Sequence, residues 1–162
     1  MTLKDALDRF DGKHTHELKE ALPLAESQPA ELMKLCQDPK TEVAATWVAK
    51  ALIEQGRASF APQDFFASLP KVTAWDAQLH ILQCVQYAPD AAVEVVAAAR
   101  TLIDSKKTLT RVWALDAFVR IADLRPEHQK EARALMVKAL DGDAASLRAR
   151  ARQLQKVVNQ WE

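Results

Sequence analysis

Polar side chains recur at helical spacing in four segments of the chain. Within each segment they stand three or four residues apart among apolar neighbours, and residues at that spacing share one face of a helix. The segments are 41–55, 73–87, 110–123 and 145–160, and the stripe of the first also includes Glu42. Aligned with one another, they predict a first row of Thr46, Asp76, Asp116 and Arg148 and a second row of Lys50, His80, Arg120 and Arg152.

The second row would form a cationic and partly titratable line. Lysine and arginine donate charge-assisted hydrogen bonds, so the row is a candidate site for an acidic peptide, a phosphate or a nucleic-acid backbone. A solvated helix surface explains the same pattern, because Asp76–His80 and Asp116–Arg120 are pairs that stabilise an exposed helix by about 0.2–0.5 kcal/mol. Both interpretations stay open. The candidate binding residues, with Trp113 added from the border of its stripe, are Lys50, His80, Arg120, Arg152, Asp76, Asp116, Arg148 and Trp113.

The four tryptophans have different predicted surroundings. Trp75 falls in an apolar arc and is predicted to lie in the core, whereas Trp47 and Trp113 border polar stripes and would pack on a neighbouring repeat or flank a groove. Trp161 is predicted at a frayed or docked C-terminal end. Largely buried side chains are predicted at Val43, Leu52, Leu79, Leu82, Phe118 and Ile121.

Charge is unevenly distributed, although the net formal charge is zero. Residues 1–99 hold 9 basic and 14 acidic side chains, and residues 100–156 hold 13 and 7. The basic C-terminal part predicts either an anion-binding patch or a polar capping helix. The zero net charge argues against a strong, general nucleic-acid binder.

Motifs for catalysis or cofactor binding are absent from the sequence. There is no phosphate-binding glycine loop, no HExxH zinc motif and no nucleophile elbow. His14 and His16, with Asp11 and Glu20, offer a partial set of metal ligands without the spacing of a structural zinc site. The sequence therefore predicts a protein that is not an enzyme and that uses neither a metal nor a cofactor.

Composition favours helices throughout. The 162 residues include 29 alanines, only three glycines and no hairpin signal, and alanine loses no side-chain entropy in a helix. Neither a secretory signal nor a membrane-spanning run is present, and Cys36 and Cys84 lack metal-ligand spacing. These features predict a cytoplasmic protein without membrane contact.

Prolines and short turns divide the chain into helix pairs. Prolines at 29, 62, 89 and 126 each precede a helical pattern, and they are spaced 27 to 37 residues apart. First helices are predicted at 29–37, 62–68, 89–103 and 126–140, each followed by one of the striped segments as second helix. Residues 1–28 would add an N-terminal helical cap, with Pro23 breaking or kinking its later helix.

The turn-and-helix pattern resembles the HEAT and armadillo class of α-helical repeats. The segments that carry the resemblance are 38–45, 104–114 and 141–150. It implies an all-α, right-handed superhelix in which residues 29–160 form about four antiparallel helix pairs within one domain, 1–162. It also implies a scaffold whose concave face binds a partner protein or acidic peptide.

A second resemblance supports a different function. HEAT-like alkylpurine DNA glycosylases present tryptophan, aspartate and arginine on a concave surface, and Trp113, Asp116, Arg120 and Arg148 are the residues here that match those types. Nucleic-acid binding or DNA repair is therefore the alternative expectation.

Overall fold

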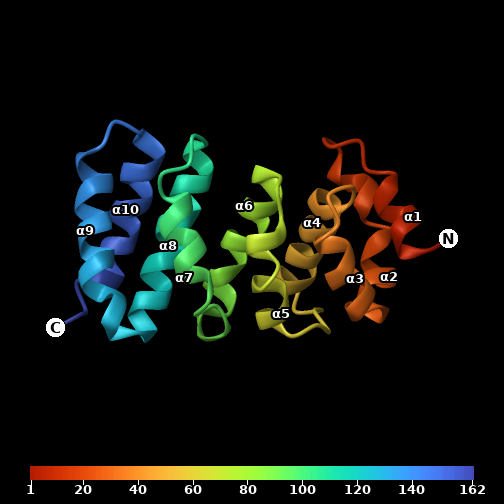
Figure 1. The fold of residues 1–162 in the computed structure, drawn as a ribbon, viewed down its shortest axis with the longest axis horizontal. Coiled ribbons are helices and arrows are strands. Elements are labelled where there is room, and N and C mark those ends of the chain that lie inside the picture. Colours follow the sequence, from red (N-terminus) through yellow and green to blue (C-terminus); the bar gives the residue numbers. More distant parts are fainter. The chain divides into compact units, whose positions relative to one another are not determined.

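The computed structural model describes residues 1–162, and all of its regular structure is helical (Figure 1). Ten α-helices and five short 3₁₀ segments follow one another without a strand, which confirms the all-α prediction. The helices are α1 (Leu3–Asp8), α2 (Ala21–Ser27), α3 (Pro29–Cys36), α4 (Glu42–Glu54), α5 (Pro62–Phe66), α6 (Trp75–Cys84), α7 (Val95–Leu102), α8 (Thr108–Leu124), α9 (Gln129–Asp141) and α10 (Ala145–Val158). The 3₁₀ segments are η1 (Thr15–Leu18), η2 (Leu69–Lys71), η3 (Val85–Tyr87), η4 (Pro89–Ala91) and η5 (Pro126–His128).

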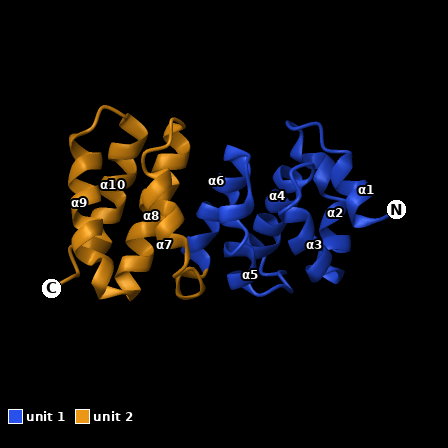
Figure 2. Ribbon diagram, in the orientation of Figure 1, with its two compact units in different colours: residues 1–87 blue, residues 88–162 orange.

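The chain divides into two compact units, Met1–Tyr87 and Ala88–Glu162 (Figure 2). In the first unit α4 packs against α2, α3 and α6. In the second unit α8 packs against α7, α9 and α10. The central helix of each unit, α4 in the first and α8 in the second, thus comes from a predicted striped segment, and the boundary follows the second predicted helix pair.

The eight predicted helices of residues 29–160 are all present, with ends that differ by a few residues in most cases. Pro29 and Pro62 begin α3 and α5 as expected, because a missing N–H costs nothing in the first turn. Pro89 and Pro126 instead begin the 3₁₀ turns η4 and η5, so α7 and α9 start several residues later than predicted. Pro23 does not break a helix, because it lies in the first turn of α2.

Glycine ends α4 at the position where the chain must turn back. Gly56 adopts a φ of 68°, a left-handed conformation that side chains with a Cβ disfavour. The N–H of Arg57 donates to the Leu52 carbonyl oxygen at 2.8 Å, and the N–H of Gly56 donates to that of Ile53 at 3.1 Å. These bonds satisfy carbonyl groups that the end of the helix would otherwise leave unpaired.

Most of the predicted core is buried. Leu52, Leu82, Phe118 and Ile121 are fully inaccessible and Leu79 is nearly so, whereas Val43 is half-buried. The prediction for Trp75 is wrong, because this residue is 42% exposed. It is the first residue of α6, where the helix face is not yet covered by a neighbouring turn. Trp161 is docked: its Nε1–H donates to Asp123 Oδ1 at 2.8 Å.

A buried carboxylate caps the start of α6. Glu42 was expected on an exposed stripe, yet it is only 1% exposed. Its carboxylate accepts hydrogen bonds from the Thr73 N–H at 3.0 Å, the Thr73 hydroxyl at 2.8 Å and the Ala74 N–H at 2.5 Å. Ala74 has no side chain that could cap its own helix, so α4 supplies the cap for α6.

Seven side-chain bonds join residues at nearly constant separation in the sequence; we call them the evenly spaced bonds. Four of them span 31 residues: Glu26–Arg57, Gln37–Ser68, Glu42–Thr73 and Arg100–Glu131. Three span 34 residues: Thr46–His80, Asp104–Lys138 and Asp116–Arg150.

Candidate functional site

A buried carboxylate between two arginines is the main charged cluster of the second unit. Asp116, in the middle of α8, is completely buried. Its Oδ1 accepts from Arg120 Nε at 2.6 Å, and its Oδ2 accepts from Arg150 Nη1, on α10, at 3.4 Å. The arginine side chains are 31% and 24% exposed, so each reaches from the buried carboxylate to solvent.

Trp113 fixes the position of the second arginine. The guanidinium carbon of Arg150 lies 4.3 Å from the centre of the Trp113 ring, at close range for a cation–π contact. Trp113 stands one turn before Asp116 on α8, so the ring and the carboxylate hold Arg150 from the same helix. We call Trp113, Asp116, Arg120 and Arg150 the α8–α10 cluster.

The α8–α10 cluster carries one excess positive charge and unused donors. Arg120 bonds to Asp116 through Nε alone, and Arg150 through Nη1 alone. A guanidinium has five N–H groups, so most donors of the two arginines have no protein acceptor. The cluster can therefore bind a carboxylate or phosphate from outside the chain.

The first unit contains an equivalent group of residues in which only the lysine is charged. Thr46, Lys50 and His80 precede Asp116, Arg120 and Arg150 by the same 70 positions. The Thr46 hydroxyl donates its single proton to the Glu42 carbonyl oxygen at 2.7 Å and accepts from Nδ1–H of His80 at 2.9 Å. Burial, with a smaller contribution from Lys50, lowers the pKa of His80 from 6.5 to about 4.

His80 is therefore neutral at physiological pH and does not contribute a charge to the predicted cationic row. Lys50 lies 3.7 Å from Glu54 and is 22% exposed, so its charge is paired within α4. Lys50 and His80 therefore do not offer the pair of guanidinium groups that Arg120 and Arg150 offer in the α8–α10 cluster. The strongest anion-binding chemistry among the candidate residues is thus confined to the second unit.

The remaining candidate residues occupy other surroundings. Asp76 is half-buried beside Lys40 and Val43, in a surface hollow of the first unit. Arg148 donates to the Gly142 carbonyl oxygen at 2.7 Å and so satisfies the end of α9. Arg152 is exposed on α10. Asp116 was expected on an exposed stripe, and that expectation is wrong because α10 covers it.

Sequence reasoning did not select Arg150. The helical wheel of the last segment placed Arg148 and Arg152 on its polar stripe and left Arg150 outside it. The sequence separation of such contacts could have identified Arg150, because Thr46 and His80 are 34 residues apart and Asp116 and Arg150 repeat that separation.

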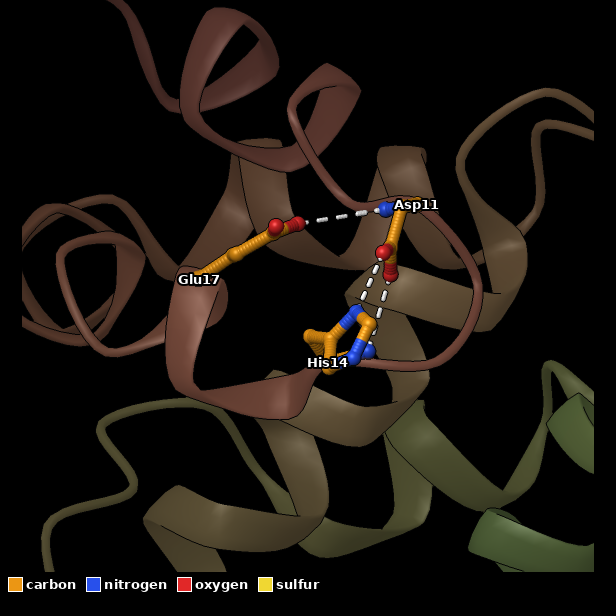
Figure 3. Close-up of side chains that lie close together, drawn as sticks. All are labelled: Asp11, His14 and Glu17. Carbon is orange, nitrogen blue, oxygen red and sulfur yellow. Dashed lines mark hydrogen bonds and ion pairs between the residues drawn. The ribbon is translucent and has the colours of Figure 1, made fainter.

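A second group of polar side chains lies near the N-terminus (Figure 3). Asp11, His14 and Glu17 each place a potential ligand atom within 4.8 Å of the others. Asp11 Oδ1 accepts from the N–H groups of Lys13 and His14 at 2.8 Å, and Oδ2 lies 2.5 Å from His14 Nδ1. Glu17 accepts from the Asp11 N–H at 3.3 Å.

These hydrogen bonds account for the conformation of the loop at residues 11–17. Hydrogen bonds from the His14 backbone and side chain and from the Lys13 backbone lower the pKa of Asp11, and the Asp11 carboxylate raises the pKa of His14. A divalent cation would have to displace the proton between Asp11 and His14. Glu20, which the sequence grouped with these ligands, pairs instead with Arg9 at 3.3 Å.

Comparison with known proteins does not assign a function to the chain. The chain matches no protein-family model, no curated protein and no solved structure. None of its helices is both long and apolar enough to cross a lipid bilayer.

Proposed function

We propose that the chain is a non-catalytic HEAT-like repeat module, an α-solenoid that holds an acidic segment of a partner protein. The observation that carries the binding proposal is the α8–α10 cluster, with two half-buried arginines over one buried carboxylate. The evenly spaced bonds support the repeat proposal, because stacked repeats place equivalent residues in contact one repeat length apart. The free cysteines, Cys36 and Cys84, fit a reducing cytoplasm.

The cluster favours a carboxylate of a partner protein as its ligand. Arg120 and Arg150 are held by Asp116 and Trp113, so little side-chain entropy remains to be lost on binding. The half-buried indole of Trp113 adds an apolar surface next to the charges. Arginine and tryptophan together are the residue types that most often dominate protein interfaces.

DNA repair of the alkylpurine glycosylase type is less well supported. In that proposal Asp116 would act on a substrate, but its two oxygens already accept from two arginines and have no exposed surface. Arg148 is engaged with the end of α9 rather than with the cluster. The same arginines could still contact a phosphate backbone, so nucleic acid is included in the test.

The test is fluorescence anisotropy at low salt with a labelled hexaglutamate peptide, a matched hexaglutamine peptide and a short DNA duplex. We expect the full chain to bind hexaglutamate, and binding to weaken with salt because the contacts are ionic. The double variant Arg120→Gln with Arg150→Gln should bind at least tenfold more weakly, since two charge-assisted bonds are lost.

The matched control is Arg125→Gln, which removes an exposed arginine just after α8 and outside the cluster. It should bind hexaglutamate like the parent protein. The proposal fails if the double variant keeps parental affinity while remaining folded, or if hexaglutamine binds equally well. Tighter binding of the duplex than of hexaglutamate would favour the nucleic-acid alternative.

A further inference from the structure

A separate cavity lies in the second unit, away from the α8–α10 cluster residues. Its volume is about 260 Å³, and it is formed where the last turns of α7 and α9 approach the first turns of α8 and α10. Ile103, Leu135 and Leu147 line it with apolar side chains. Arg111 is the charged residue that α8 contributes to the wall.

Arg111 has a buried donor without an acceptor. Its Nε–H is inaccessible to solvent and makes no hydrogen bond, while Nη2 donates to the Thr108 hydroxyl at 3.2 Å. The Nε–H itself is therefore closed to an acceptor in the cavity, and the other N–H groups of the guanidinium are the ones that a ligand can meet. Because the guanidinium is a permanent cation and Arg111 lines the cavity, the fitting acceptor beside it is an anion.

The other charges of the cavity lie at its rim. Lys138 and Asp104 pair with each other at 3.4 Å, and their side chains are 75% and 70% exposed, so water screens both. Asp143 is also exposed. Ala144, the residue before α10, provides no side-chain cap, so the unpaired N–H groups of the first turn of α10 add positive potential on the same side.

We propose that this cavity binds a small organic acid through Arg111. The carboxylate accepts from the Arg111 guanidinium, and a short branched apolar body packs against Ile103, Leu135 and Leu147. The volume lies just below the roughly 300 Å³ at which pockets for drug-sized ligands begin, so the ligand is a compact monocarboxylate. Apolar walls with one well-placed charge are the usual composition of such sites. This site is independent of the peptide-binding function.

The test is an NMR titration of the full, isotope-labelled chain with isocaproate and with isocaproamide, which has the same shape and no charge. Isocaproate should shift backbone resonances around Arg111, Leu135 and Leu147. Isocaproamide should bind at least tenfold more weakly, because the bond to the guanidinium loses its charge assistance. This comparison uses the parent protein and does not depend on whether a variant folds.

Two variants and a control extend the test. Arg111→Gln should weaken isocaproate binding at least tenfold, whereas Arg125→Gln, at the opposite end of α8, should leave it unchanged. Ala139→Leu adds bulk to the cavity wall and should abolish binding of both compounds. Equal binding of acid and amide, shifts outside the cavity, or no shifts at all would overturn the proposal.

Discussion

Glu42 offers the sharpest test of how α4 and α6 are held together. Replacing it with alanine leaves the N–H groups of Thr73 and Ala74 without their buried acceptor. At about 1 kcal/mol per capping bond, the two N–H groups account for about 2 kcal/mol. The one buried methylene that is lost, Cγ, adds about 0.8 kcal/mol. Relief of the carboxylate's own desolvation offsets part of this, so we expect Glu42→Ala to lower the free energy of unfolding by about 1–3 kcal/mol.

Glu42→Gln separates the charge from the volume. The glutamine side chain keeps the shape but presents an NH₂ group to a cluster of donors, so we expect a loss of about 1–2 kcal/mol. Glu54→Gln is the matched control at the other end of α4. Its carboxylate is exposed and pairs only with Lys50, so we expect a loss of no more than about 0.5 kcal/mol.

Urea denaturation followed by far-ultraviolet circular dichroism measures these differences. Amide hydrogen exchange at Thr73 and Ala74 reports on the cap directly, because both N–H groups should exchange faster once the acceptor is gone. Equal denaturation midpoints for Glu42→Ala and Glu54→Gln, with unchanged exchange at the two amides, would refute the capping role.

Three further outcomes follow from buried groups. Because the folded-state pKa of His80 is about 4 against an ordinary 6.5, the unfolded chain binds its proton first, and stability should fall by up to about 3 kcal/mol as pH drops from 6.5 to 4. His80→Gln should flatten that part of the pH–stability curve. Leu82→Ala and Phe118→Ala should each cost about 2–5 kcal/mol in chemical denaturation, since both side chains are fully buried. Burial raises the pKa of the Cys36 and Cys84 thiols, so a thiol reagent should modify neither in the native protein and both in urea.

The helices could be predicted from the sequence because their signals are local. The prolines and turns that separate the helix pairs act through the backbone of the residues next to them, whatever packs around them. The apolar face of each second helix was equally legible, and it led to Leu82 and Phe118 as buried residues. The starts of α7 and α9 were missed because a proline can also begin a separate 3₁₀ turn.

The candidate site could be predicted only in part, because a helical wheel does not say what covers a polar stripe. Glu42 and Asp116 both fall on stripes that look exposed, yet the residues just before α6 satisfy one carboxylate and α10 covers the other. Arg150 entered the site through a contact between helices, which no single wheel contains. The separation of 34 residues was the one available signal, and it becomes informative only when a contact such as Thr46–His80 is known.

The evenly spaced bonds have a consequence for how the chain folds. Each joins residues 31 or 34 positions apart, so its formation closes a loop of modest and nearly constant length. The entropy of loop closure grows only slowly with length, so the evenly spaced bonds have similar closure costs. In the proposed repeat module, folding would start at any helix pair and spread to its neighbour, and an end of the array would open without waiting for the rest.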